Sequence, residues 1–495
     1  MGIVLKQTIK GSLYSYLGVI LGALNVALLF PILFSEAEIG LINIFVSISA
    51  MLGQISCLGS NGIISYFFPK FEDKISHHNR FFSFIWLYSM LGFAVLSIIF
   101  YLIADKWLIE RMPDSEILRE YSILILPLTF FTLSFLIVDT FASSTLKATL
   151  GSFYKELVMR IVITALIALF YFELIDFEKF LWLYVLNFAI PAMAVYIHLY
   201  YKGDISLKLP SLKIYRPHMK SMASIGLFFI LNGLSNSIAI YIDKLMITYY
   251  IGLRGTGVYS IANFIGTIVR IPRLAMGKIS TPIIAQAIKD EDYGSLQKFF
   301  RLSVISQVLV GFLIFIPIWI NIDIFLSLLP PSYAEGKWVV FFISLSFLVT
   351  CFLGIGTQII QLSSYYKLIT YFNLIMGLAI VLLNIVFIPL WGIVGAAFAT
   401  LISKSVLVIL FLYVIRKNFK FVIFIKENYS IVLISTLIIV GTSFIPVFQI
   451  LNHNIINSIA NILIRTIVAL SIWAYSMKLL GIFNQTELKT SIFKR

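Results

Sequence analysis

The chain has 495 residues, of which 60% are apolar and 12% are charged. This charged share is about half that of an ordinary soluble domain, so soluble globules, disordered chains and disulfide-stapled secreted modules are excluded. More apolar side chains are present than a water-facing surface can hide. The composition therefore predicts an all-α polytopic membrane protein. The formal net charge is +14. In a membrane protein such an excess is explained by cytoplasmic loops rich in Lys and Arg, so no nucleic-acid partner is expected.

Fourteen apolar runs approach the roughly 20 residues that a helix needs to cross the hydrocarbon core. They predict spans one to fourteen at 11–34, 39–66, 81–103, 121–143, 157–175, 180–200, 222–250, 257–285, 302–327, 338–362, 368–388, 392–415, 429–448 and 458–480. The first run leads directly into further spans, so we expect an uncleaved helix and not a signal peptide.

The loop charges indicate an orientation. With a cytoplasmic N-terminus, the inner loops and tails hold 23 Lys or Arg residues and the outer loops hold six. Because cytoplasmic loops collect basic residues, this asymmetry supports both the number of spans and two cytoplasmic termini. The largest inner loop, 201–220, separates six spans from eight.

A short internal repeat links the two parts of the chain. Gly40 near the start of span two aligns with Gly257 at the start of span eight, and each follows a short outer loop. Repeated bundles around a central site are a common plan of transporters.

Cysteines and histidines carry no site pattern. Cys57 and Cys351 lie in separate apolar runs without a CxxC partner, so packed, reduced thiols are expected. The five histidines show no metal-ligand spacing. Neither a metal nor a catalytic group is predicted.

Four of the cations inside predicted spans lie well away from the span ends: Arg270 and Arg273 in span eight, Lys404 in span twelve, and Arg465 in span fourteen. A central Arg or Lys costs about 2.5–3.5 kcal/mol on insertion scales. Each must therefore contact water, a counter-ion or an anionic ligand. Arg270 and Lys404 are predicted to lie at matching depth, and Pro272 is expected to interrupt the helix beside Arg270. A cationic cavity and a purely structural network both remain open.

Polar residues recur on other spans. Asn25 in span one is a candidate to bind the substrate, and it belongs to a small-residue stripe that also suits a close helix contact. The remaining amides of interest are Gln54 and Asn61 in span two and Asn232 and Asn236 in span seven. They suit either sugar hydroxyls across a wet cavity or hydrogen bonds between helices.

Three passages resemble the Wzx-type polysaccharide flippases of the multidrug/oligosaccharidyl-lipid/polysaccharide (MOP) exporter superfamily. They are Glu38–Lys70, Tyr241–Ile265 and IPLWGIVGAAFATLIS at Ile388–Ser403. The resemblance implies a six-helix lobe at 1–210, a second at 211–418 in a V-shaped arrangement with the first, and appended helices thirteen and fourteen with a tail at 419–495.

The resemblance also implies a function, that of a flippase in the bacterial plasma (inner) membrane. Such a flippase moves an undecaprenyl-pyrophosphate-linked oligosaccharide from the inner to the outer leaflet by alternating access. This step belongs to O-antigen and lipopolysaccharide synthesis. Arg270, Arg273 and Lys404, with Arg465, would bind the pyrophosphate. Expected partners are the lipid-linked oligosaccharide, membrane lipids, and a polysaccharide polymerase with other assembly proteins. No cofactor is expected, while a coupling proton or Na⁺, in an antiport, is left open, with Asp243 or Asp139 as its site.

Departures from related families leave two alternatives. Drug exporters of the superfamily typically carry an acidic residue in the first span, and the peptidoglycan-precursor flippases carry arginines in the first two spans; residues 11–34 contain no acid and residues 11–66 contain no arginine. An ion-coupled exporter of small amphipathic compounds is the first alternative, although a cationic cavity would repel a cation. A membrane polysaccharide polymerase or ligase is the second, although the outer loops are short.

Overall fold

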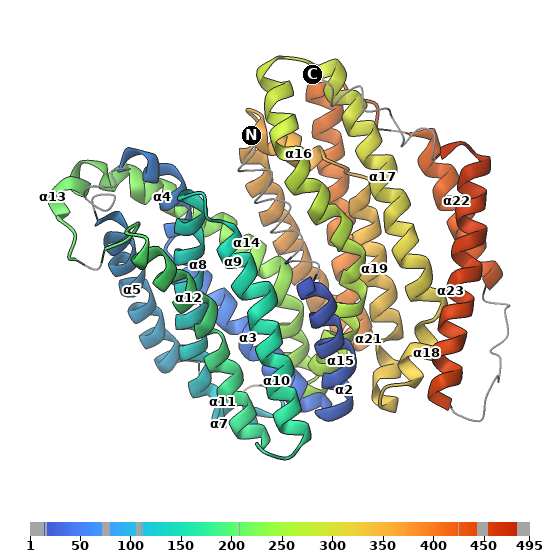
Figure 1. Cartoon of the computed structure of the whole chain (residues 1–495), viewed down its shortest axis with the longest axis horizontal. Helices are drawn as coiled ribbons and strands as arrows, with labels where there is room; N and C mark the ends of the chain where they lie inside the picture. The colour runs from blue at the N-terminus through green and yellow to red at the C-terminus, as the bar shows by residue number, and fades with distance from the viewer. Residues whose placement is uncertain are drawn as a thin grey trace. The chain divides into compact units, whose positions relative to one another are not determined.

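The structure is a computed structural model. It describes residues 14, 17–71, 80–104, 110, 112–206, 208–423, 425–442 and 454–482. All regular secondary structure in these ranges is helical (Figure 1), which confirms the predicted all-α class. The start of predicted span one, the end of span thirteen and the C-terminal tail lie outside the described residues.

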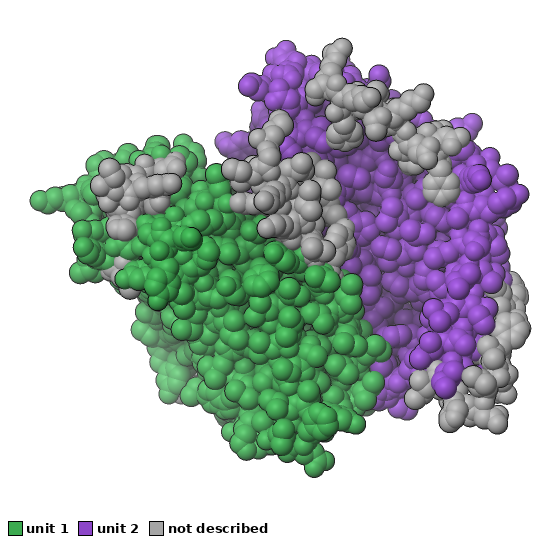
Figure 2. Space-filling view, in the orientation of Figure 1, with its two compact units in different colours: residues 1–260 green, residues 261–495 purple. Residues whose placement is uncertain are grey.

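The chain divides into two compact units, residues 1–260 and 261–495, coloured green and purple in Figure 2. The helices of unit 1 are α2 (Phe30–Leu33), α3 (Glu36–Ser56), α4 (Ser60–Phe67), α5 (Phe81–Ile99), α7 (Ser115–Glu120), α8 (Ile125–Ser144), α9 (Thr149–Ser152), α10 (Met159–Tyr171), α11 (Phe177–Asn187), α12 (Ala189–Tyr201), α13 (Leu212–Tyr215) and α14 (Met219–Tyr250). Helix α15 (Leu253–Thr267) begins in unit 1 and ends in unit 2. The lobe boundaries at 210 and 418 stay predictions.

Unit 2 holds the remaining helices. They are α16 (Ile271–Lys289), α17 (Tyr293–Ile320), α18 (Ile322–Ser327), α19 (Lys337–Cys351), α20 (Gly356–Leu362), α21 (Lys367–Val414), α22 (Lys426–Thr442) and α23 (Asn454–Leu479). Helices α22 and α23, at predicted spans thirteen and fourteen, pack on α17 and on each other.

Every predicted span coincides with helical structure in the described part of the chain. Nine of the described helical segments are long and apolar enough to cross a membrane by themselves. One of them, Lys367–Phe419, contains two predicted spans. The helix is interrupted between these two spans at Gly392, whose φ of 60° and ψ of −138° are non-helical. A side chain is rarely tolerated at this φ, so the glycine marks the junction of spans eleven and twelve.

Side-chain caps set several helix starts. Ser35 accepts the amide of Glu38, and the Glu38 carboxylate accepts the amide of Ser35, forming a capping box at α3. Asp114 accepts the amide of Leu253 at 2.9 Å and so caps α15 from a distant loop. Asp292 caps α17, where hydrogen bonds from Ser295 lower the pKa of the carboxyl group. The cap is therefore ionised at neutral pH.

Each unit has an apolar core of its own. Phe67, Phe81 and Phe141 are fully buried in unit 1 among α4, α5 and α8. In unit 2, Trp473 is buried and its indole donates to the Ser435 hydroxyl at 2.9 Å, joining α23 to α22. The two cysteines form no disulfide bond, and each is buried in one of the two cores, as expected for structural thiols.

Gly40 and Gly257, which the sequence aligns, form a reciprocal helix crossing. A Cβ at Gly40 would overlap the carbonyl of Leu253, and a Cβ at Gly257 would overlap the carbonyl of Glu36. Leu253 lies four residues before Gly257, and Glu36 lies four residues before Gly40. Each glycine therefore meets the equivalent carbonyl of the other helix. This is the geometry of a local two-fold axis between α3 and α15. Both positions require glycine because the backbones touch.

We expect Gly40→Ala and Gly257→Ala each to destabilise the protein by about 1–3 kcal/mol, because the added methyl group overpacks the crossing. Unfolding in detergent, followed by size-exclusion fluorescence after heating, measures the effect. Gly441→Ala is the matched control, since no atom lies within 4 Å of its Cβ position. Equal stability of all three variants would contradict the reciprocal crossing.

Candidate functional site

The predicted site residues divide between the two units. Seven lie in unit 1: Asn25, Gln54, Asn61, Asp139, Asn232, Asn236 and Asp243. Four lie in unit 2: Arg270, Arg273, Lys404 and Arg465. The two groups are treated separately below.

Arg270 and Lys404 lie on one aromatic ring. The Lys404 ammonium is 3.4 Å from the centroid of the Phe347 ring on α19, and the Arg270 guanidinium carbon is 6.0 Å from it. Lys404 also donates to the hydroxyl of Ser346 at 3.1 Å. Arg270 is exposed and Lys404 is half-buried. The two cations come from spans eight and twelve, and the matching depth predicted for them agrees with this shared contact.

Arg273 lies one helical turn further along. The chain passes from α15 through a 3₁₀ turn at Ile268–Arg270 into α16, which has Pro272 in its first turn. This is the interruption predicted for the proline. Arg273 is half-buried and donates to the hydroxyl of Thr357 on α20 at 2.9 Å. Span eight therefore directs its two arginines to different neighbours, an aromatic ring and a hydroxyl.

Unit 2 is strongly basic and has no acidic residue at the centre of its spans. Residues 261–495 contain 18 Lys or Arg and seven Asp or Glu. The acidic residues are Asp290, Glu291, Asp292, Asp323, Glu335, Glu427 and Glu487, all in loops, at helix ends or in the tail. The central cations consequently have no carboxylate of their own unit at the same depth.

The ring contact offsets only part of the cost of these cations. A cation–π contact contributes about 0.5–2 kcal/mol, whereas a central Lys or Arg costs about 2.5–3.5 kcal/mol. The exposed guanidinium of Arg270 needs a further favourable contact, and water or an anion can supply it.

Arg465 has a different environment. It is buried, with 8% of its surface exposed, and donates to the carbonyl of Thr442 at 3.2 Å. Its Nε is buried without a hydrogen-bond partner. The described contact joins α23 to α22, so the structure places Arg465 in the packing of the last two helices.

Asn25 joins span one to helix α10. Its side-chain amide donates to the carbonyl of Arg160 at 3.1 Å, and its oxygen accepts the Thr164 hydroxyl at 3.0 Å. Arg160 also donates to the carbonyl of Gly18. Asn25 is only 2% exposed. The small-residue stripe of span one is thus a close contact with α10, one of the two alternatives that the sequence left open.

The other amides of unit 1 are less fully bonded. Gln54 on α3 packs against Gly233 of α14, and its Nε2 is buried without a hydrogen-bond partner. Asn61 accepts the amide of Gly62 at 3.0 Å. On α14, Asn232 is half-buried and Asn236 is exposed.

The two acidic candidates also differ. Asp243 is 6% exposed and accepts the hydroxyl of Tyr259 at 2.7 Å. The adjacent Lys244 donates to the side chain of Asn43 on α3 at 2.7 Å. Asp139 on α8 lies directly over Gly151, where a Cβ would overlap its carboxylate.

Sequence reasoning missed several residues of these groups. Lys244 was detectable, because it is a charge inside predicted span seven. Phe347 and Thr357 had no comparable signal, since an aromatic or hydroxyl residue in a span is common. Only the packing of α19 and α20 beside span eight brings them to the arginines.

Solved structures provide the comparison with known proteins. No family model and no curated protein matches the chain. It is similar to the lipid II flippase MurJ in an inward closed conformation, with 15% identity, 96% of this chain and 99% of that chain covered, and a TM-score of 0.72. It is also similar to a MATE-family multidrug resistance transporter of the MOP superfamily in an inward-facing conformation, with 16% identity, 84% and 98% covered, and a TM-score of 0.62.

The chain has the fold of MOP-superfamily transporters. A third similar structure is a MOP-superfamily transporter from Pyrococcus furiosus whose binding pocket is described as reversed in polarity, with 15% identity, 84% and 96% covered, and a TM-score of 0.54. At these identities the likeness establishes a multi-pass membrane fold and not a substrate.

Phe347 and Lys404 are expected to be energetically coupled. A double-mutant cycle of Phe347→Leu and Lys404→Met should give a coupling energy of about 0.5–2 kcal/mol, the range of a cation–π contact. Reversible unfolding in mixed micelles measures it. Phe342→Leu on the same helix is the control, because its ring packs on Phe398. A coupling as small as that of the control would refute the ring contact.

Asn25→Ala is expected to lower the free energy of unfolding by about 1–3 kcal/mol, because buried Asn25 no longer bonds its half-buried partners Arg160 and Thr164 on α10. Transport per folded molecule should stay unchanged. Thr436→Val, which removes an exposed hydroxyl bonded within its own helix, should leave stability almost unaltered. Loss of transport without loss of stability would show instead that Asn25 contacts the substrate.

Proposed function

We propose that this protein is a Wzx-type flippase that moves an undecaprenyl-pyrophosphate-linked oligosaccharide from the inner to the outer leaflet of the bacterial plasma membrane. Both termini are proposed to lie in the cytoplasm. The fold of MOP-superfamily transporters supports transport as the class of activity.

One observation carries the proposal: Arg270 and Lys404 share the ring of Phe347, in a unit whose spans hold no acidic residue at that depth. A pyrophosphate brings negative charge that can contact both side chains. Arg is suited to it because a guanidinium binds phosphate oxygens with two parallel hydrogen bonds. Arg273 extends the cationic surface by one turn, while Arg465 serves packing and only secondarily the ligand.

A lipid-linked anion suits this arrangement better than a small cation does. A cationic site repels cationic drugs by several kcal/mol when charges approach closely, so the small-compound exporter is disfavoured. The hydrocarbon tail of a lipid-linked substrate can stay in the bilayer, so that only the headgroup needs polar contacts. The amides of Gln54, Asn61, Asn232 and Asn236 are proposed for sugar hydroxyls, and Gln54 brings an unpartnered donor.

The coupling ion is proposed to act in unit 1. Asp243 is buried beside Tyr259 and Lys244, and Asp139 is the second candidate. A proton or Na⁺ at either carboxylate would bias the conformational equilibrium if it bound one state more tightly than the other.

Arg270→Gln combined with Lys404→Gln is expected to reduce flipping by about a hundredfold or more, because each charged hydrogen bond to phosphate contributes about 1.5–3 kcal/mol and the variant removes two of them. Proteoliposomes containing labelled lipid-linked oligosaccharide measure the rate at which the label becomes accessible on the opposite face. The label should remain chemically unchanged.

Lys367→Gln provides the control, since it removes an exposed charge at the start of α21. Full flux in the double variant, with normal folding, would remove these cations from the site. Elongation of the labelled oligosaccharide would favour a polymerase or ligase over a flippase.

A further inference from the structure

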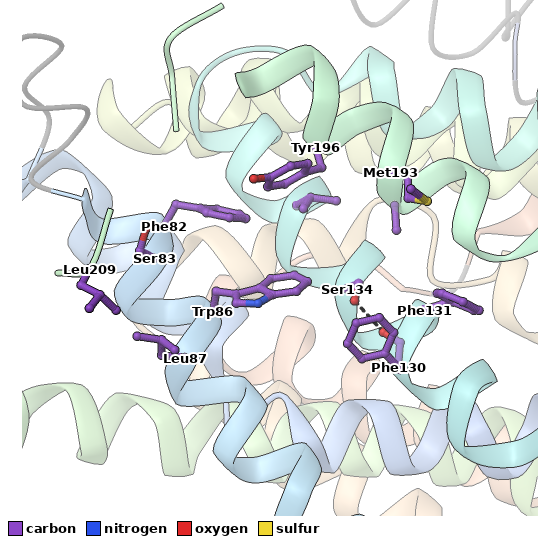
Figure 3. A pocket seen from close by; sticks show the side chains of 12 residues that line it. Phe82, Ser83, Trp86, Leu87, Phe130, Phe131, Ser134, Met193, Tyr196 and Leu209 are labelled. Carbon is purple, nitrogen blue, oxygen red and sulfur yellow. Dashed lines mark hydrogen bonds between the residues drawn. The ribbon is translucent and has the colours of Figure 1, made fainter. Parts of the chain in front are cut away.

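Two apolar cavities lie on adjacent faces of helix α5 in unit 1. The first, about 520 Å³, is lined by α5, α8, α12 and Leu209, and Figure 3 shows its lining. The second, about 280 Å³, lies between α5, the start of α14 and the segment 210–212. Neither cavity belongs to the cationic group of unit 2.

The first cavity has an aromatic wall. The Trp86 ring lies 5.9 Å from Phe82 and 6.3 Å from Phe130, measured between ring centroids. Phe82 in turn lies 5.9 Å from Tyr196. Such a surface binds hydrocarbon without loss of hydrogen bonds.

The side chains that line this cavity carry few polar atoms, and both of its serine hydroxyls are satisfied. The hydroxyl of Ser83 donates to the carbonyl of Ser206, and that of Ser134 donates to the carbonyl of Phe130. The hydroxyl of Tyr196 is buried without a hydrogen-bond partner, and the indole N–H of Trp86 is a second donor in the lining. A ligand that fills the cavity therefore needs to be mostly hydrocarbon, with an acceptor at one point.

The two cavities meet at two places. Leu87 lines both of them from α5 and is 45% exposed. In the neighbouring loop, Leu209 lines the first cavity and Pro210 the second. A ligand with two chains joined at one end fits this division, with one chain on each side of Leu87.

The rim beside this loop is basic. Arg80, directly before α5, donates from its guanidinium to the carbonyl of Leu209 at 2.9 Å. Lys208 is exposed next to Leu209. The loop charges predict that this end of α5 is cytoplasmic, and basic side chains at that surface attract anionic lipid headgroups.

The cavity sizes suit acyl chains. A cavity of about 150 Å³ holds benzene, with six carbons, so the two spaces hold about twenty and about eleven carbons at that packing. One long polyprenyl chain exceeds either space and leaves the second cavity unexplained. We infer that an anionic phospholipid of the cytoplasmic leaflet straddles α5, with one acyl chain in each cavity and its phosphate at Arg80 and Lys208.

Trp86 serves as the reporter for this site. The full-length protein is placed in phosphatidylcholine nanodiscs with increasing amounts of phosphatidylglycerol or phosphatidylcholine that carry identical brominated chains. The difference in fluorescence between the wild type and Trp86→Phe isolates the quenching of Trp86. Half-maximal quenching is expected at a mole fraction at least about tenfold lower for brominated phosphatidylglycerol, because two basic residues favour it.

Arg80→Gln combined with Lys208→Gln should move the phosphatidylglycerol curve onto that of phosphatidylcholine. Lys298→Gln combined with Lys367→Gln removes the same charge from exposed positions of unit 2 and should leave the curve unchanged. Coincident curves in the wild type, or no quenching of Trp86, would overturn the inference.

Native mass spectrometry gives a second measurement that does not require Trp86→Phe to fold. The wild type should retain one phosphatidylglycerol that the Arg80/Lys208 double variant loses, and equal retention by both would also overturn the inference. The site does not depend on the proposed flippase activity, so either proposal can fail alone.

Discussion

The central constraint on this protein is the free energy of placing positive charge inside the membrane. In residues 261–495 the acidic side chains occupy only loops, helix ends and the tail, while cations occupy the spans. The Phe347 ring and the hydroxyls of Ser346 and Thr357 stabilise these cations only in part. This imbalance is the basis of the proposal that the cations bind an anionic ligand.

A second constraint is the close approach of helix backbones. In a membrane, helices gain little from the hydrophobic effect against each other and associate through tight packing and hydrogen bonds. The Gly40–Gly257 crossing and the hydrogen bonding of Asn25 to α10 are two examples. Both occur within unit 1, where they bring segments distant in the chain into direct contact.

The likeness to MurJ and to MATE transporters concerns the fold. One fold can carry sites of different polarity, because the backbone arrangement leaves the side chains of each span free to vary. The first two predicted spans here contain no arginine, and the central cations lie in later spans. Any difference in substrate between proteins of this fold therefore depends on such side chains.

The sequence by itself determined the membrane class, the helical spans and the interruption at Pro272, while the depth of Arg270 and Lys404 in the membrane stays a prediction. These are local properties, since hydropathy, proline and distance from a span end are all read along one helix. Only the tertiary structure decided which neighbours each side chain meets. In the structure Asn25 bonds to α10, Arg465 packs against α22, and Phe347 contacts two cations. Such contacts join residues tens of positions apart or more, so they depend on helix packing, which no single segment encodes.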